Sequence, residues 1–326
     1  MSTETLTTAP PADTAARGGL TWTVLRLHRS ALLVWSAYVL LMVGWMLWLQ
    51  YVTGAEIRAE RDACRRLADG CIDLGSAFDY SSAMSWIGTL IAYFSYGVAA
   101  WAGAALTGVE LERGTAQLSW TQSVTPVRWL TAKLALPAVA LTVGTTVLVL
   151  VYRWTWSTNR DLRGDEWYYT DPFLNRGPAV LAYALCALAV GALAGIVLRR
   201  ALPALAVALG FMIVFHAWLD VRYHELWPAT TLTGTAASRL PMSADQLELG
   251  AVTGSGARVE DLDCFDADAD LDYTRCMSGK GFTDLYAEVH PASHFWPLHL
   301  MTTGVILAVA VLATLAAFWL LRRRTR

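Results

Sequence analysis

The chain has 326 residues, of which 55% are hydrophobic and only 16% are charged, and its formal net charge is −2. A soluble domain usually has about 25% charged and 45–50% apolar residues, so this composition argues against a soluble protein. We expect membrane lipid around the chain and no nucleic-acid partner.

Six long stretches carry no charge, and each has about 20 residues or more, the length that an apolar helix needs to cross a bilayer. An open sheet could not satisfy its backbone in lipid, and barrel strands would need only about 9–11 residues. The predicted fold class is therefore an all-α integral membrane protein with six transmembrane helices, both termini in the cytoplasm and a large outer loop before the last helix. The transmembrane domain is predicted over 31–321, with spans at about 31–52, 85–107, 132–152, 178–198, 202–219 and 296–321.

The segment before the first span is predicted to stay with the mature chain. Residues 1–17 are small and polar, with Ala9-Pro10-Pro11, and are typical of a disordered cytoplasmic tail. They lack the basic start of a signal peptide, and the first apolar stretch lacks a cleavage site. Residues 18–30 mix Leu and Trp with Arg and His, which predicts either a short interfacial helix or an extension of the first span.

Basic residues set the predicted orientation. With the amino terminus inside, the inner segments hold 12 of the 25 bases but only 4 of the 27 acids. Bases in short loops near helix ends mark the cytoplasmic side. Arg199 and Arg200 fill a two-residue turn, and a basic tail over 322–326 follows the last span. The extracellular loops are then 53–84, 153–177 and 220–295.

Four of the five cysteines fall in the outer loops. Cys64 and Cys71 share the first loop, and Cys264 and Cys276 share the last one. Close pairs on the outer side predict disulfides in an oxidising compartment. Free buried thiols are the alternative. Cys186 stands alone in the fourth span, where simple packing explains it.

Small residues follow one face of the fourth span. Ala187, Gly191 and Gly195 recur at spacing four, which lets helix backbones approach closely. This pattern indicates a packing seam within one subunit or, alternatively, a dimer interface.

The last outer loop is long enough to form a small external subdomain. The acidic run Asp263–Asp272 superficially resembles a calcium loop, but Leu271 stands where such a loop needs glycine. A solvated acidic surface is the preferred interpretation, and a cation site is the alternative. The outer histidines are a second candidate, although no metal or cofactor is expected, because Pro291 interrupts their spacing and no cysteine–histidine pattern is present. They are His216, His224, His290, His294 and His299.

No recognisable catalytic motif is present. The chain lacks a phosphate-binding loop of the form G-x-x-x-x-G-K-[ST], a G-x-S-x-G elbow and an H-E-x-x-H helix. The cores of the spans also lack Asp, Glu, Lys and Arg, which argues against an ion-coupled transporter or pump. We therefore expect no enzyme and no catalytic residue. Any transport would be driven by a partner, and uncharged walls suit an amphipathic or lipid-like cargo.

The inner loop over 108–131 is the only one long enough to present a structured surface. Thr115 is placed to cap a short helix from Ala116 onward, which Pro126 would end or bend. We expect the charged pair Glu112 and Arg113 to face water or lipid headgroups.

The same loop carries a family resemblance. The string E-x-E-R-G-T-x-x-L over 110–118, then W-T-Q-S-V-T-x-x-R-W-L over 120–130 and Lys133, resembles the permease subunits of type-2 (ABC-2) ABC transporters, most closely the actinobacterial branch. The stretch 290–298 and the Trp22…His28-Arg29 entry are also similar to that branch. His290 and Met301-Thr302 depart from it, since glutamine and an aromatic-Ile-Glu stretch are expected there.

The resemblance implies a six-helix permease of the cytoplasmic (plasma) membrane that pairs with a second permease copy, identical or related. It also implies that the inner loop holds a coupling helix, which docks in a groove of a cytosolic ABC ATPase subunit. An ordinary polar loop is the alternative. The implied ATPase contacts are Glu110, Glu112, Arg113, Gly114, Thr115 and Gln117.

The sequence thus predicts the permease subunit of an ATP-binding-cassette exporter, with ATP hydrolysed by a separate subunit. A second hypothesis is a non-transporting membrane sensor or assembly factor that uses its extracellular loop domain. An ATPase reading frame beside the gene would favour the first.

Overall fold

The computed structural model describes residues 29–64, 66, 75–121, 124–162, 166–260 and 277–325. The predicted tail, nearly all of the predicted interfacial helix and the acidic run over 263–272 lie outside these residues.

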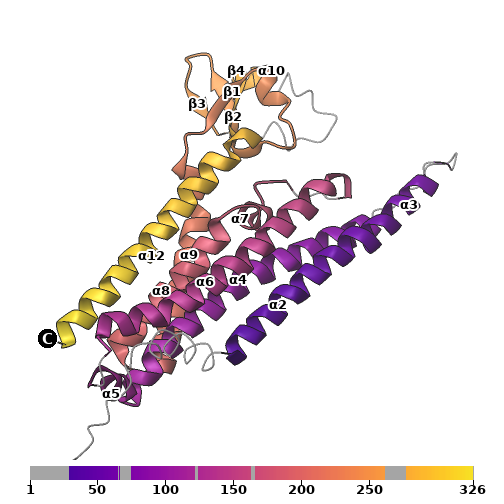
Figure 1. Ribbon diagram of the computed structural model, residues 1–326. Helices are drawn as coiled ribbons and strands as arrows, with labels where there is room; N and C mark the ends of the chain where they lie inside the picture. Colours follow the sequence, from indigo (N-terminus) through magenta and orange to yellow (C-terminus); the bar gives the residue numbers. More distant parts are fainter. Residues whose placement is uncertain are drawn as a thin grey trace, which may run out of the picture.

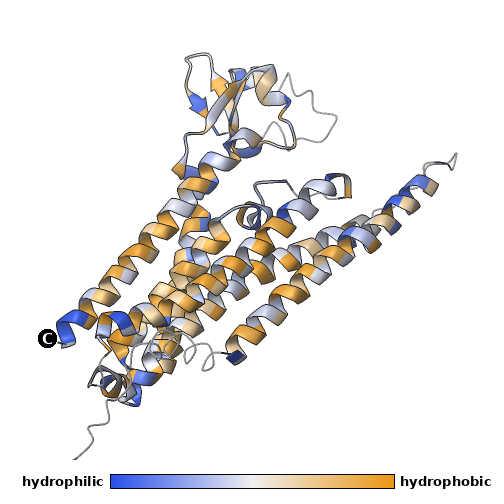
Figure 2. Cartoon of the chain, in the orientation of Figure 1, coloured by the Kyte–Doolittle hydropathy of each residue, from blue (hydrophilic) through white to orange (hydrophobic). Residues whose placement is uncertain are grey.

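Six helices in the described part are long and apolar enough to cross a membrane. They lie side by side and are hydrophobic along most of their length (Figures 1 and 2). The first is continuous through three segments, α2, a π-helical turn η1 and α3. The segments are α2 (Arg29–Trp48), η1 (Leu49–Thr53), α3 (Gly54–Cys64), α4 (Gly75–Glu112), α6 (Pro126–Thr158), α8 (Ala179–Leu198), α9 (Ala201–Arg222) and α12 (Phe295–Thr325).

Several of these helices run past the predicted spans. The first covers 36 residues and α4 covers 38. At 1.5 Å per residue each is roughly 55 Å long, whereas the hydrocarbon core is about 30 Å thick. In α3 the sequence GAEIRAERDAC is polar but rich in Ala, Glu and Arg, which favour helix in water as well. The apolar windows therefore locate the spans but not the helix ends.

Short elements connect the long helices. α5 (Thr115–Thr121) lies between α4 and α6, and α7 (Thr170–Asn175) precedes α8. The 3-10 turns are η2 (Arg160–Leu162), η3 (Tyr223–Leu226) and η4 (Ala292–His294). α5 and the C-terminus share one end of the bundle, which we call the α5 end (Figure 1). The opposite end is called the sheet end.

α8 is the centre of the bundle. Most of its side chains are buried, and it packs against α4, α6, α9 and α12. The contact with α4 is a backbone approach, because a Cβ on Gly191 would lie 2.6 Å from the carbonyl oxygen of Ala100. A Cβ on Gly195 would overlap the Thr107 hydroxyl. The seam of small residues on α8 therefore packs within the chain.

A four-stranded antiparallel sheet interrupts the helices between α9 and α12. Its order is β1-β4-β2-β3, and α10 (Thr235–Ser238) packs against it. In β4, Leu285, Ala287 and Val289 alternate with other residues and are buried in a small core of their own. Because alternation over nine residues does not register as an apolar stretch, the prediction of an all-α protein is wrong for this segment. The strands are β1 (Thr230–Thr233), β2 (Asp245–Thr253), β3 (Arg258–Val259) and β4 (Phe282–His290).

Candidate functional site

The connection between α4 and α6 forms a compact corner at the α5 end. Gly114 has φ +70°, a left-handed conformation that glycine adopts without strain, and it separates α4 from α5. Thr115 begins α5, and its hydroxyl donates to the carbonyl oxygen of Glu110 at 3.3 Å. This bond satisfies one of the carbonyls that the end of α4 leaves open.

α5 has an inner and an outer face. Ala116 is fully buried, and one turn later Trp120 packs edge-on against Trp129 of α6, with ring centroids 5.8 Å apart. On the other face Gln117 is exposed, and Leu118 is 63% exposed. An apolar side chain displayed beside polar ones suits contact with a protein partner.

Pro126 begins α6 rather than ending α5. Thr125 is the N-cap of α6, and its hydroxyl accepts a hydrogen bond from the main-chain N–H of Arg128 at 3.3 Å. Proline fits the first helical position because its missing N–H would have no helical partner there. The predicted role of Pro126 is therefore wrong, although the short helix before it is present.

Glu110 points into the protein. Its carboxylate pairs with the ammonium group of Lys133 and accepts a hydrogen bond from the indole N–H of Trp129 at 2.9 Å. The side chain of Lys133 is only 8% exposed. Helix α4 extends beyond the predicted end at residue 107, and this places Glu110 against α6.

Glu112 also makes a structural contact. Its carboxylate accepts a hydrogen bond from the main-chain N–H of Ala201 at 3.2 Å, where α9 begins. A negative charge there is favourable, because the unpaired N–H groups give a helix start a partial positive charge. Glu112 is exposed, as expected, but its contact with Ala201 was not predicted, since nothing in the local pattern relates residue 112 to residue 201.

The remaining predicted contacts are on the surface. Arg113, Gly114, Thr115 and Gln117 are all exposed. Leu118 joins them and was missed, although the apolar residues Ala116 and Trp120 on the other face of α5 would have pointed to it. We call the exposed set Arg113, Gly114, Thr115, Gln117 and Leu118 the α5 surface.

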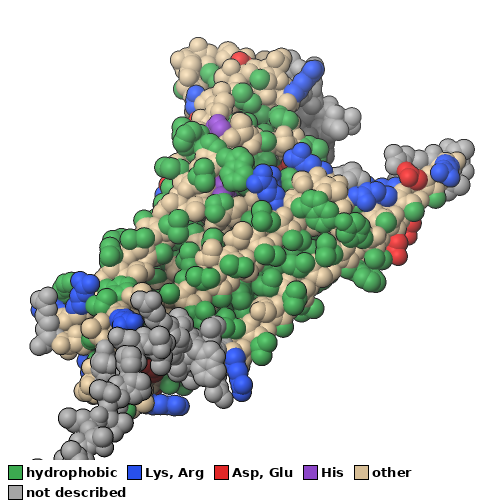
Figure 3. Space-filling model, viewed as in Figure 1, with side chains coloured by type: hydrophobic (Ala, Val, Ile, Leu, Met, Phe, Trp, Pro, Cys, Tyr) green, Lys and Arg blue, Asp and Glu red, His purple; other side chains and the backbone are tan. Residues whose placement is uncertain are grey.

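The α5 end is also rich in basic residues. Arg324 of α12 donates to the carbonyl oxygen of Ile196 at 2.6 Å, near the end of α8, where a positive charge is favourable. Arg199, the residue directly after α8, has φ 53° and turns the chain toward α9. Figure 3 shows hydrophobic side chains over the flank of the bundle, with most Lys and Arg near its ends.

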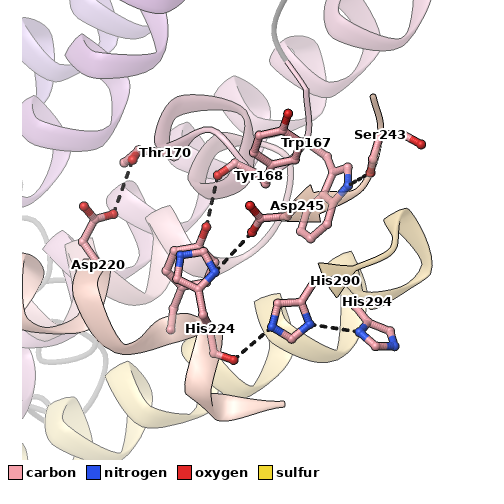
Figure 4. A network of polar contacts seen from close by, with 10 residues as sticks. Trp167, Tyr168, Thr170, Asp220, His224, Ser243, Asp245, His290 and His294 are labelled. Carbon is pink, nitrogen blue, oxygen red and sulfur yellow. Dashed lines mark hydrogen bonds and ion pairs between the residues drawn. The ribbon is translucent and has the colours of Figure 1, made fainter. Parts of the chain in front are cut away.

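At the sheet end, three of the five outer histidines meet (Figure 4). His224 Nδ1 lies 3.2 Å from Asp245 Oδ2, and His290 Nε2 lies 3.1 Å from the carbonyl oxygen of His224. His290 Nδ1 is 3.0 Å from His294 Nδ1. Since a carbonyl only accepts, His290 donates through Nε2, and its Nδ1 accepts from His294 while His290 is neutral. Burial lowers the pKa of His290.

The other two histidines lie within the helices. His299 Nε2 accepts from the main-chain N–H of Ala179 at 3.1 Å, and His216 Nε2 is 3.0 Å from the Tyr93 hydroxyl. The five outer histidines therefore do not converge on one point. Within the ranges described, no group of three His, Cys, Asp or Glu side chains is arranged to hold a metal ion.

One indole and one phenol group, both from the segment before α7, join this segment to the sheet subdomain. The Trp167 indole donates to the carbonyl oxygen of Ser243 at 2.7 Å (Figure 4). The Tyr168 hydroxyl donates to that of Met242 at 3.4 Å. The subdomain is thus attached to the bundle through side chains as well as through the chain itself.

The predicted disulfides fall largely outside the described residues. Cys64 ends α3 and is disulfide-bonded, whereas Cys71, Cys264 and Cys276 are not among the residues described. The pairings Cys64–Cys71 and Cys264–Cys276 stay predictions. Cys186 is free and buried.

Comparison with known protein families gives a match over more than half of the chain. A family model described as ABC-2 membrane transporter related matches residues 36–222. The match begins within α2 and ends at the last residue of α9, so it contains α5 and covers more than half of the chain. No curated protein and no solved structure matches.

Proposed function

This chain belongs to the ABC-2 membrane transporter related family, and from that premise we propose that it is the permease subunit of an ATP-binding-cassette exporter. It is a multi-pass protein of the cytoplasmic membrane with six candidate spans. The energy comes from ATP hydrolysed by a separate cytosolic subunit, because the sequence holds no phosphate-binding loop of its own.

The α5 surface is the proposed docking site for that subunit. α5 combines a buried inner face with an exposed outer one that carries Leu118, Gln117 and Arg113. Its inner face packs against α6, and Glu112 of the preceding helix contacts α9. A push on α5 would therefore act directly on α4 and α6, and on α9 through Glu112 of α4. This linkage is the observation that carries the proposal.

The proposed orientation puts the α5 end in the cytoplasm and the sheet subdomain outside. The turn at Arg199 and Arg200, the basic end of α12 and Arg113 all lie at the α5 end. Positive charge near helix ends favours the cytoplasmic side. Two permease copies, or one copy with a related chain, would form the complete pathway, and its uncharged walls suit an amphipathic or lipid-like cargo.

Site-specific photo-crosslinking tests the docking site. A photoreactive amino acid at Leu118 is expected to capture one protein in cells, and mass spectrometry should identify it as an ATPase with a phosphate-binding loop. The matched control is Leu312, which is 65% exposed on α12 within the membrane span and should capture no ATPase. Capture at Leu312 but not at Leu118 would contradict the proposal.

A further inference from the structure

An apolar groove runs along the flank of the bundle between α6, α8 and α12. Its volume is about 440 Å³, and apart from Thr131 and Thr314 its walls are apolar. Both hydroxyls are satisfied within their own helices. Thr131 donates to the carbonyl oxygen of Val127 at 2.9 Å, and Thr314 donates to that of Ala310 at 2.8 Å. The walls therefore offer hydrocarbon contacts and no open hydrogen-bonding group from these side chains.

The groove has the length of one leaflet. On α12 it extends from Leu307 to Phe318, eleven steps of 1.5 Å, or about 16 Å. The hydrocarbon core of a bilayer is about 30 Å thick, so half of it is about 15 Å. Because Phe318 lies toward the C-terminus, the groove occupies the leaflet at the α5 end.

Two arginines continue the groove beyond its apolar part. Arg322 is four residues after Phe318, and Arg128 is three residues before Thr131 on α6. Residues three or four apart share a helix face, so both arginines lie on the groove faces of their helices. Both are exposed, and neither forms an ion pair with an acid in the part of the chain that the structure describes.

The two helices are close together at this end. Phe318 of α12 and Leu134 of α6 pack against the same buried cluster, which contains Leu130 and Leu321. The neighbouring arginines have other contacts, because Arg323 lies over the Trp319 ring and Arg324 donates to Ile196. Two positive charges with no ion pair among the described residues therefore border one end of an apolar groove, where their mutual repulsion favours an anion between them.

We propose that this groove binds one anionic phospholipid from the leaflet at the α5 end, with an acyl chain along α6, α8 and α12 and the phosphate between Arg128 and Arg322. Basic pockets between membrane helices on the cytoplasmic side are suited to acidic lipid headgroups. The acyl chain of a zwitterionic lipid would fit the groove equally well, but its headgroup would gain less binding free energy from the arginine pair. The site therefore selects lipids by headgroup charge.

Native mass spectrometry of the full-length protein, delipidated in detergent, tests the site. Phosphatidylglycerol and phosphatidylcholine with identical acyl chains are titrated in separate samples. The wild type is expected to bind one phosphatidylglycerol in preference to phosphatidylcholine. Arg128→Gln/Arg322→Gln should weaken phosphatidylglycerol binding about 30-fold, since each surface arginine contributes roughly one kcal/mol toward an acidic lipid. The matched control Arg323→Gln, one residue along α12 and on another face, should change it less than about two-fold.

A second variant tests the apolar part. Ala135 is exposed and lines the groove, so Ala135→Phe should fill it and weaken both lipids. Three results would each overturn the proposal. One is unchanged phosphatidylglycerol affinity in the double arginine variant. Another is unchanged affinity in Ala135→Phe. The third is efficient disulfide cross-linking of Val311→Cys between two copies, which would show that a second chain covers the groove.

Discussion

The carboxylate of Glu112, the last residue of α4, accepts a hydrogen bond from the main-chain N–H of Ala201, the first residue of α9. The two residues are 89 positions apart in the chain. The contact joins α4, the helix before α5, to the start of α9, so it links the helix that carries the proposed docking surface to the fifth span.

Replacing Glu112 by alanine should destabilise the α5 end. The change removes both an acceptor and a negative charge at the start of α9, and a helix cap of this kind contributes about 1 kcal/mol. Glu112→Gln keeps an acceptor and should lose less. Thermal unfolding in detergent would measure both. Gln117→Ala serves as the control because Gln117 is exposed. An equal loss of thermal stability in all three variants would show that Glu112 does not stabilise the start of α9.

The pair of Lys133 and Glu110 should matter more for stability than for docking. Lys133 is buried, whereas Glu110 keeps 24% of its side chain exposed. Removing one partner of a buried ion pair costs about 3–5 kcal/mol, and we expect about 3 kcal/mol for Glu110→Leu because water still reaches the carboxylate. Glu110→Leu/Lys133→Met should recover much of the loss in a thermal unfolding assay. Additive losses in the double variant would show that the two side chains act independently.

The α4–α8 contact depends on glycine. Gly191→Ala places a methyl group 2.6 Å from the Ala100 carbonyl oxygen, so the helices must separate, and overpacking of this kind costs about 1–3 kcal/mol. Gly304 in α12 has nothing within 4 Å of its added Cβ, and Gly304→Ala should be neutral or stabilising. Thermal unfolding of the two variants compares them directly. Equal midpoints would mean that the backbone approach is not required.

The junction at the sheet end should weaken as the pH falls. Burial lowers the pKa of His290, which faces His294, His224 and Asp245. The folded protein therefore holds fewer protons on His290 than the unfolded chain does. Its contribution to stability is complete above a pH of about 6.5 and is lost as the pH falls below that value. Unfolding midpoints of wild type and His290→Gln between pH 5 and 7.5 would test this, and identical pH slopes would contradict it.

The six spans could be predicted from the sequence because lipid tolerates little except long apolar helices. The helix ends could not, since α3 and the last turns of α4 are polar yet continue as helix. This is why Glu110 was expected in a loop and instead meets Lys133. The sheet was missed because its apolar residues alternate along nine-residue strands such as β4.

The candidate site was predicted in outline only. The presence of the short helix and its start near Thr115 were predicted from local residues, but its end was not, because α5 ends at Thr121 and Pro126 begins α6. The contact of Glu112 with Ala201 and the pairing of Arg324 with Ile196 depend on how distant helices pack. No local pattern contains that information.

The central claim is that the α5 surface couples this permease to an ATPase subunit. Arg113→Glu/Leu118→Asp is the best variant for testing it, because both side chains are exposed, whereas Glu112 has a structural contact. An ATPase surface that is complementary to the positive charge of Arg113 would repel the introduced acids, which should cost several kcal/mol of binding free energy. The matched control is Leu312→Ser, which changes an exposed residue of α12 within its candidate membrane span.

The decisive measurement is ATP hydrolysis by the partner subunit reconstituted with the permease in liposomes. The account predicts that wild type and Leu312→Ser stimulate hydrolysis and retain the ATPase on co-purification, while Arg113→Glu/Leu118→Asp inserts and folds normally but does neither. Full ATPase binding and full stimulation by the double variant would contradict the account.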